Sequence, residues 1–286
     1  MMNQLKTILL LGVLSAVLIA FGSLLGPGSF YLFTALAIAM NVGAYFFSDR
    51  LVLRMNGARD LPREEAPRLH AMVEELSSRA GIPKPRVCLV PAPYANAFAT
   101  GRNPEKGVVA VTEGLLRVLD ERELRGVIAH ELAHIKNRDI LVSTIAASIA
   151  AAVSYVANAV QFAAIFGGAS QDEEGGSPAG ALAMAVIAPI AAMMVQLGIS
   201  RSREYLADDT AARLTGDPES LALALERLSE AVEAIPARPQ PATASLFIVN
   251  PLAGAGALLN LFSTHPPMAR RIARLRAFAS GVRMAV

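Results

Sequence analysis

The chain has 286 residues, of which 53% are hydrophobic and only 17% are charged. Soluble domains average about 25% charged residues, so this composition is unsuited to an ordinary water-facing surface and excludes disorder or a coiled coil. The net charge of +2 gives no reason to expect a nucleic-acid partner, which would require a clustered basic face. Because Cys88 is the single cysteine, no internal disulfide can form, and any metal must be held by His, Asp or Glu.

Four apolar blocks without a charged residue predict membrane-spanning helices. A helix needs about 20 residues to cross a hydrocarbon core about 30 Å thick. The first two blocks are joined by a short Gly-Pro-Gly-Ser segment and predict a helical hairpin, with a signal peptide as the alternative for the first block. The third is rich in alanine and is expected to pack against protein as well as lipid. The blocks cover residues 8–25, 30–47, 140–166 and 179–200.

The distribution of Lys and Arg predicts the orientation of these crossings. The connecting segments 26–29 and 167–178 contain neither residue type. By the positive-inside rule, the basic segments therefore lie in the cytoplasm, and the chain enters and leaves on that side. We expect four parts: a transmembrane hairpin at 1–48, a cytoplasmic catalytic part at 49–138, a second hairpin at 139–200 and a second cytoplasmic catalytic part at 201–286.

A His-Glu-x-x-His motif occupies residues 130–134, inside a strongly helical pattern that begins with a capping box of Asp120 and Glu123. The two histidines are one helical turn apart on one face, where they can take two vertices of a tetrahedral zinc site. Glu131 adjoins the first of them and can reach a metal-bound water. The alternative is a helix with two solvated or core histidines.

A catalytic zinc also needs a third protein ligand and one open position. Glu204 and Asp208 share a face of a predicted helix, so one can bind the metal while the other hydrogen-bonds a ligand histidine. An acidic face exposed to water is the alternative. The expected topology favours the metal site, because His134 precedes the third apolar block and Glu204 follows the fourth, so both lie near the same membrane face.

Short apolar runs at 86–90 and 108–112 predict two β-strands, and residues 95–100 predict an edge strand. An exposed edge can bind an extended peptide through backbone hydrogen bonds, although a purely structural sheet is equally compatible with the pattern. Further helices are expected over 67–81 and 268–279. The fold class is therefore mainly α with a small β-sheet.

These motifs together resemble the HtpX-type integral-membrane zinc metalloproteases, a family related to the CAAX prenyl proteases. The resemblance spans nearly the whole chain, and it implies a zincin-like metalloprotease domain built around four transmembrane helices in two hairpins. Prenyl proteases carry more crossings, which argues against a true CAAX enzyme. The motifs are NAFATG at 96–101, HELAHIKNRD at 130–139, SREYLADD at 202–209 and STHPPMARRIARL at 263–275.

The resemblance also implies roles for individual residues around one Zn²⁺ per chain. Three residues would bind the metal, namely His130, His134 and Glu204. Glu131 would be the general base, and Asp208 would orient a ligand histidine.

Two further groups of residues are implied by the same resemblance. His265 and Arg271 match positions near the site that stabilise the oxyanion. Asn96, Ala97 and Phe98 match a stretch that lies beside the bound peptide.

The function expected from the sequence is a zinc-dependent endopeptidase of a bacterial-type cytoplasmic membrane, with the bilayer and membrane or membrane-near proteins as its partners. A role in removing misfolded proteins under stress follows from the resemblance alone. The alternative is a membrane-anchored peptide-binding protein with a structural zinc, but such sites are usually closed by four protein ligands. A transporter would need ionisable groups within the crossings, and none lies in the four blocks.

Overall fold

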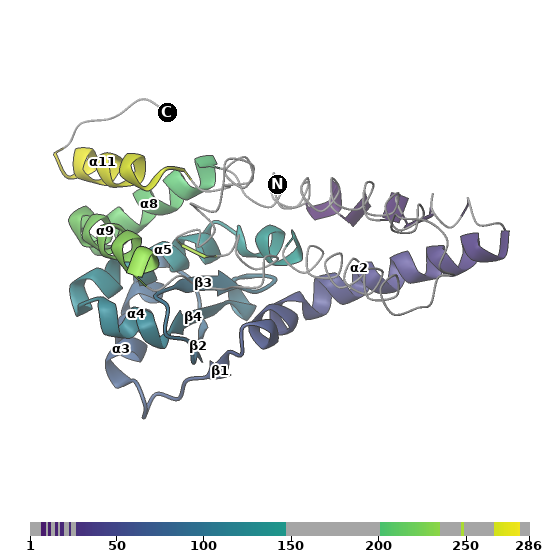
Figure 1. Ribbon diagram of the computed structural model, residues 1–286, viewed down its shortest axis with the longest axis horizontal. Helices are drawn as coiled ribbons and strands as arrows, with labels where there is room; N and C mark the ends of the chain where they lie inside the picture. The colour runs from purple at the N-terminus through teal and green to yellow at the C-terminus, as the bar shows by residue number, and fades with distance from the viewer. Residues whose placement is uncertain are drawn as a thin grey trace, which may run out of the picture.

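The computed structural model describes residues 27–146, 201–234, 247–248 and 266–280, with a few positions before residue 24. Half of the first predicted crossing, most of the second hairpin, and His265 lie outside these residues. In the part described, one long helix, α2, extends away from a body of four strands and several helices (Figure 1). The predicted division into four parts stays a prediction.

Helix α2 (Pro27–Met55) contains the second predicted crossing. Among the described residues it is the one helix that is long and apolar enough to cross a membrane, and only 6% of its apolar window is buried. A core helix would bury large side chains such as Tyr31, Leu32 and Ile38, whereas all three are exposed here. Its 29 residues extend about 43 Å, which exceeds a hydrocarbon core of about 30 Å, so its last turns can reach the rest of the molecule.

The sheet has the strand order β1-β2-β4-β3. Strands β2 (Arg86–Val90) and β4 (Val108–Thr112) are parallel and match both predicted strands. Strand β3 (Ala97–Thr100) pairs antiparallel with β4 and forms one edge of the described sheet, as predicted, although it begins two residues later than expected. The short strand β1 (Arg59–Asp60) forms the other edge.

Both faces of this sheet are covered, so β3, β4 and all of β2 except Arg86 are buried, whereas the short edge strand β1 is exposed. On one face, alternate side chains such as Val87 and Val109 join the main core formed with the helices. On the other face, Cys88, Ala110 and Phe98 pack against the end of α2. The α2 residues in that second core are Val52 and Leu53. The apolar helix is therefore packed directly against the back of the sheet rather than joined to it by a free linker.

Helix α5 (Glu121–Lys136) lies at the centre of the main core, between the sheet and the other helices. It begins with the predicted capping box, in which the Glu123 N–H donates to Asp120 Oδ1 over 2.8 Å and the Asp120 N–H donates to Glu123 Oε2 over 3.0 Å. The surrounding helices are α3 (Pro67–Ala80), α4 (Glu113–Val118), the 3₁₀ turn η1 (Pro104–Lys106), α8 (Arg201–Thr215), α9 (Pro218–Ala234) and α11 (Met268–Ala279).

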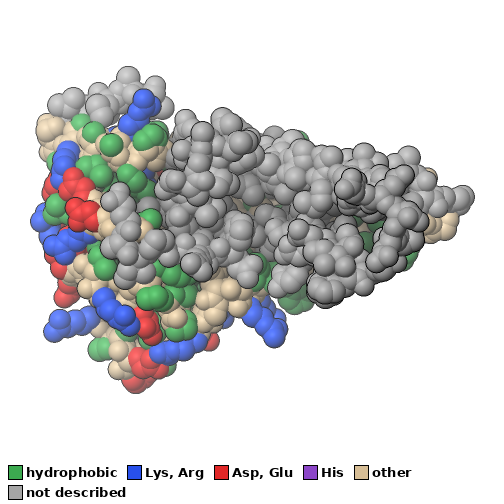
Figure 2. Space-filling view, in the orientation of Figure 1, with side chains coloured by type: hydrophobic (Ala, Val, Ile, Leu, Met, Phe, Trp, Pro, Cys, Tyr) green, Lys and Arg blue, Asp and Glu red, His purple; other side chains and the backbone are tan. Residues whose placement is uncertain are grey.

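Charged side chains gather on the part of the surface formed by these helices and the sheet, away from the far end of α2 (Figure 2). Many of them form ion pairs on this surface, such as Arg276 with Glu219 and Glu226. This separation of a charged body from an apolar helix is the one expected for a protein with a water-facing part and a lipid-facing part.

Gly126 allows α5 to approach α9 closely. A Cβ atom at this position would lie 2.6 Å from the backbone nitrogen of Leu221 and 2.8 Å from its Cα. These are backbone atoms at the start of α9, so they cannot move aside as the end of a flexible side chain would. The distance between the two helices therefore requires glycine here.

We expect Gly126→Ala to destabilise the protein by about 1–3 kcal/mol, the usual cost of overpacking a core. Thermal unfolding of the detergent-solubilised protein measures the effect. Gly43→Ala is the matched control, because a Cβ at this helical position would meet no atom within 4 Å among the described residues outside its own stretch of helix. Equal melting temperatures for the two variants would contradict the proposed constraint.

Candidate metal centre

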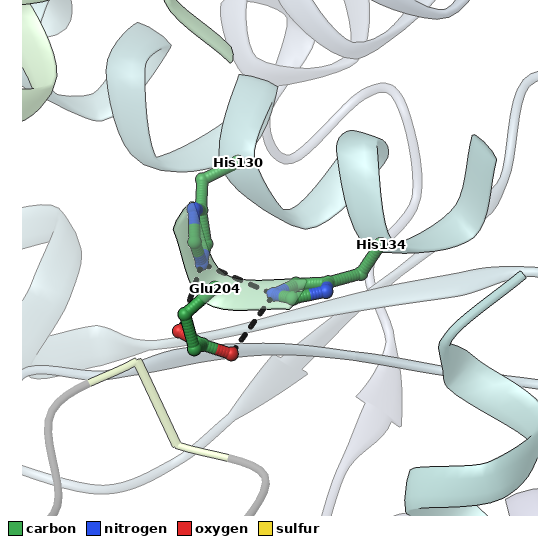
Figure 3. Close-up of side chains that lie close together, drawn as sticks. All are labelled: His130, His134 and Glu204. Atoms are coloured by element: carbon green, nitrogen blue, oxygen red, sulfur yellow. Dashed lines mark hydrogen bonds and ion pairs between the residues drawn. The ribbon is translucent and has the colours of Figure 1, made fainter. Parts of the chain in front are cut away.

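Two imidazoles from α5 and one carboxylate from α8 point toward a common centre (Figure 3). The Nε2 atoms of His130 and His134 are 3.1 Å apart. A carboxylate oxygen of Glu204 lies 3.5 Å from His134 Nε2, and the other lies 3.7 Å from His130 Nε2. The site is enclosed, since His130 and Glu204 are buried and His134 is largely so.

This donor set fits a zinc ion. Zinc–ligand distances of about 2.0–2.2 Å and tetrahedral angles place neighbouring ligand atoms about 3.3 Å apart. The three separations of 3.1, 3.5 and 3.7 Å lie close to that value. Two nitrogens and one carboxylate would supply three ligands to a zinc ion, the number of protein ligands that is usual in catalytic zinc sites.

His130 is held on its other nitrogen by a buried ion pair. Its Nδ1 lies 3.0 Å from Asp208 Oδ1. Arg271, from α11, donates to both oxygens of Asp208, with Nε–Oδ2 of 2.9 Å and Nη2–Oδ1 of 2.7 Å. Burial alone would raise the pKa of Asp208, but Arg271 and His130 lower it to about 2, so the group is a carboxylate at neutral pH. This geometry suits the orienting role expected of Asp208.

His134 is held in the same way by Asp139, a residue to which the sequence analysis assigned no role. The distance from His134 Nδ1 to Asp139 Oδ2 is 3.3 Å, and Arg203 Nη1 lies 3.6 Å from the other oxygen, Oδ1. Helical periodicity could not identify Asp139, because α5 ends before it at Lys136. The one signal in the sequence was that Asp139 is the last residue of the HELAHIKNRD motif, and the motif by itself gives this residue no role.

The two histidines differ in their affinity for protons. Burial lowers the pKa of His130. Burial also acts to lower the pKa of His134, but the hydrogen bond with Asp139 and the negative charges of Glu204 and Glu131 raise it to about 9. Without a metal, the protonated His134 can therefore donate to His130 across the 3.1 Å contact. A divalent cation would replace this proton between the two rings.

Glu131 lies beside this centre and has an unusual acidity. Burial, together with the charge of Glu204, raises its pKa to about 7, while His134 and the backbone N–H of Ala99 act to lower it. A carboxyl group with a pKa near neutrality can both accept and release a proton at physiological pH. The hydrogen bond to Ala99 also places the edge strand β3 next to the centre.

The remaining site residues predicted from the sequence lie in different surroundings. Arg271 is fully buried, and besides Asp208 it donates to the carbonyl of Ile248 over 3.2 Å. The Asn96 side chain is buried, and its Oδ1 accepts the Ile248 N–H over 3.2 Å. Ala97 and Phe98 are buried on opposite faces of β3, in the main core and in the core beside α2 respectively. His265 falls outside the described residues.

Comparisons with known proteins show the family of this chain. The family model for peptidase family M48 matches residues 63–279, which is more than half of the chain. A protein named Protease HtpX homolog from Desulforapulum autotrophicum is 52% identical over 278 residues, covering 96% of this chain and 89% of that protein. Its namesake from Syntrophobacter fumaroxidans is 53% identical over 280 residues, covering 96% of this chain and 99% of its own length.

An archaeal relative with the same name, from Pyrococcus furiosus, is 50% identical over 276 residues and covers 96% of this chain and 95% of its own. A crystal structure of S. mikatae Ste24p is also similar, with a TM-score of 0.48 and 19% identity over 86% of this chain and 57% of that one. Because a peptidase family model covers most of its length and relatives are half identical across nearly all of it, the chain belongs to peptidase family M48 and is a metalloprotease.

Proposed function

We propose that this metalloprotease is an integral-membrane zinc endopeptidase in which His130, His134 and Glu204 bind the metal and Glu131 is the general base. The observation that carries the proposal is the convergence of the three ligand atoms within 4.8 Å, beside a buried carboxyl group whose pKa is about 7. Metalloproteases of this family are zinc-dependent in general, which supports zinc over other divalent cations.

The chemistry divides between the metal and the protein. When bound, zinc polarises the scissile carbonyl and increases the acidity of the attacking water. Glu131 accepts the proton of that water and passes it to the nitrogen of the leaving amine. Burial raises the pKa of Glu131 to about 7 in the metal-free protein. The charge of a bound zinc ion would lower this pKa, which would leave the carboxylate ionised and able to accept the proton.

The edge of β3 is the proposed binding site for the peptide backbone. The Thr112 N–H donates to the Asn96 carbonyl over 3.0 Å, so alternate residues of β3, including Phe98, direct their backbone groups toward β4. Ala97 and Ala99 direct theirs away from β4, to the side on which no strand of the described sheet lies, and the Ala99 N–H contacts Glu131 there. An extended substrate added to this edge would bind mainly through its backbone, so it would be recognised with little regard to sequence.

Asn96 supplies a further group for substrate. Its Nδ2 is buried and has no hydrogen-bond partner in the described part of the chain. An unsatisfied buried donor costs about 1–3 kcal/mol, a cost that a substrate carbonyl would remove. The contact of its Oδ1 with Ile248 holds the amide in place for that purpose.

Arg271 is proposed to act through its neighbours. Its donors already serve Asp208 and the Ile248 carbonyl, and its Nη1 lies 3.5 Å from Glu204. These contacts support a role in holding Asp208, and through it His130, more directly than contact with an oxyanion. The oxyanion role inferred for His265 stays a prediction.

The proposed membrane arrangement follows from α2. Arg50 and Arg54 lie at the end of the helix that packs against the sheet, whereas the connecting segment 26–29 at its other end carries no basic residue. The positive-inside rule then places the metal centre on the cytoplasmic side. We further propose membrane or membrane-near proteins, including misfolded ones, as substrates, and four crossings in two hairpins as the topology.

Replacing the proposed base should separate catalysis from metal binding. We expect Glu131→Gln to lower the rate of casein cleavage by about 10²–10⁴-fold, because the amide cannot accept a proton, while zinc content stays at one per chain. The control is Glu121→Gln on the same helix, whose carboxylate is exposed in a loose pair with Arg68. Undiminished proteolysis by Glu131→Gln would refute the base assignment.

Replacing the third ligand should remove the metal. We expect Glu204→Ala to lose most of its zinc during purification, as measured by elemental analysis, because two histidines alone leave two vertices open. Asp209→Asn, on the same helix but paired with Arg274, should keep its zinc. If Glu204→Ala retained a full complement of zinc, Glu204 would not be a ligand.

Removing Arg271 should destabilise the fold as well as the site. Arg271→Leu leaves Asp208 buried without its partner, so we expect a loss of about 3–5 kcal/mol in thermal or denaturant unfolding. Adding Asp208→Asn to Arg271→Leu should recover part of the lost free energy of unfolding, because the second substitution removes the uncompensated charge. Arg274→Leu breaks a more exposed pair and should cost about 0–1 kcal/mol. Equal effects of the two single arginine substitutions would contradict the assignment.

A further inference from the structure

We propose that Asp139 is the positioning residue for His134, holding its ring through Nδ1 so that Nε2 faces the metal, and that it joins this ligand to α8 through Arg203. The inference rests on the proposed function, since it assumes that His134 binds a metal.

The first support is the geometry of the His134 ring. An imidazole has two nitrogens, and a hydrogen bond to one selects the tautomer and ring plane that present the other. His134 Nδ1 is 3.3 Å from Asp139 Oδ2, while Nε2 is 3.1 Å from His130 Nε2 and 3.5 Å from Glu204. Asp139 is 4% exposed, so water does not compete strongly for this contact.

The second support is the backbone that brings Asp139 into place. In a continuous α-helix, a residue five positions after His134 would be rotated by about 140° around the axis and could not face it. Instead, α5 ends, and Arg138 adopts the left-handed conformation with φ of 58°. The Asp139 N–H then donates to the His134 carbonyl over 3.0 Å, so residue 139 is folded back onto the last turn of α5.

The left-handed residue is an arginine and not a glycine, so this reversal is conformationally unfavourable by itself. Asp139 then occupies the N-cap position of the next helical residues, because its carbonyl accepts the Ser143 N–H over 3.2 Å. The turn at Arg138 therefore reverses the chain and, in doing so, directs the side chain of the next residue, Asp139, at His134.

The third support is the parallel with His130. Each ligand histidine contacts a buried carboxylate through Nδ1, and each carboxylate has an arginine on its other side. For His130 these are Asp208 and Arg271. For His134 they are Asp139 and Arg203, whose Nη1 is 3.6 Å from Asp139 Oδ1. Arg203 directly precedes the third ligand, so Asp139 contacts both ligand-bearing helices.

Two neutral substitutions separate positioning from capping. Asn and Ser both favour the N-cap and both remove the charge facing Arg203, but only Asn is long enough to accept a hydrogen bond from His134. In the full-length detergent-solubilised protein, zinc affinity is measured by competition with a chelator. The Co²⁺-substituted protein reports ligand geometry through its visible absorption.

We expect Asp139→Ser to bind zinc about 10- to 100-fold more weakly than the unmodified protein, with a changed Co²⁺ spectrum, and Asp139→Asn to be weakened only several-fold. The metal-free forms of the two variants should melt at the same temperature. Asp209→Asn, whose carboxylate pairs with Arg274 on the outer side of α8, should leave affinity and spectrum unchanged.

Each outcome is decisive. If the unmodified protein binds no zinc, the proposed metal site fails. If the unmodified protein binds zinc and both Asp139 variants bind it as tightly as the unmodified protein does, the metal site stands and the positioning role of Asp139 is overturned. Should Asp139→Ser not fold, Asp139→Asn decides: weaker zinc binding supports the role, and unchanged affinity refutes it.

Discussion

The arrangement of this protein depends on concentrating negative charge in a buried space next to two imidazoles. Four carboxylates surround the centre, from Glu131, Asp139, Glu204 and Asp208. Such groups are costly to bury unless they are compensated. Two arginines, Arg203 and Arg271, contribute one positive charge each. A divalent cation would add positive charge at the same place, so metal binding would further compensate the negative charge that is buried here.

The fold serves this centre by placing α5 between the sheet and the helices that carry the other groups. One side of α5 contacts β3, which brings the edge strand of the described sheet to Glu131, and another contacts α8, which brings Glu204 and Asp208. The sheet is packed on its opposite face by the end of α2. The apolar helix, the sheet and α5 with its two histidines are thus successive layers of one packed unit, which ties the position of the candidate metal centre to that of α2.

The contacts of the two histidines explain why the surrounding arginines are buried, because each histidine contacts a carboxylate through Nδ1 and each carboxylate lies next to an arginine. An arginine behind a carboxylate keeps it ionised, as the pKa of about 2 for Asp208 indicates, and an ionised carboxylate holds the Nδ1 proton of its histidine. Each Nε2 is then available to a metal. The arginines come from α8 and α11, so the orientation of the rings on α5 depends on elements remote in sequence.

The sequence by itself determined the local features: the capped helix with both histidines on one face, the strands at 86–90 and 108–112, and the apolar helix around residues 30–47. These follow from periodicity and capping, which act over a few residues. It left Glu204 and Asp208 interchangeable until a family resemblance distinguished them. Three contacts became known only from the tertiary structure. Asp208 contacts His130, and Arg271 pairs with the same carboxylate. Asp139 is folded back so that it contacts His134. The reason is physical: these contacts join separate elements or follow a left-handed residue, and no helical or strand period extends across such a junction.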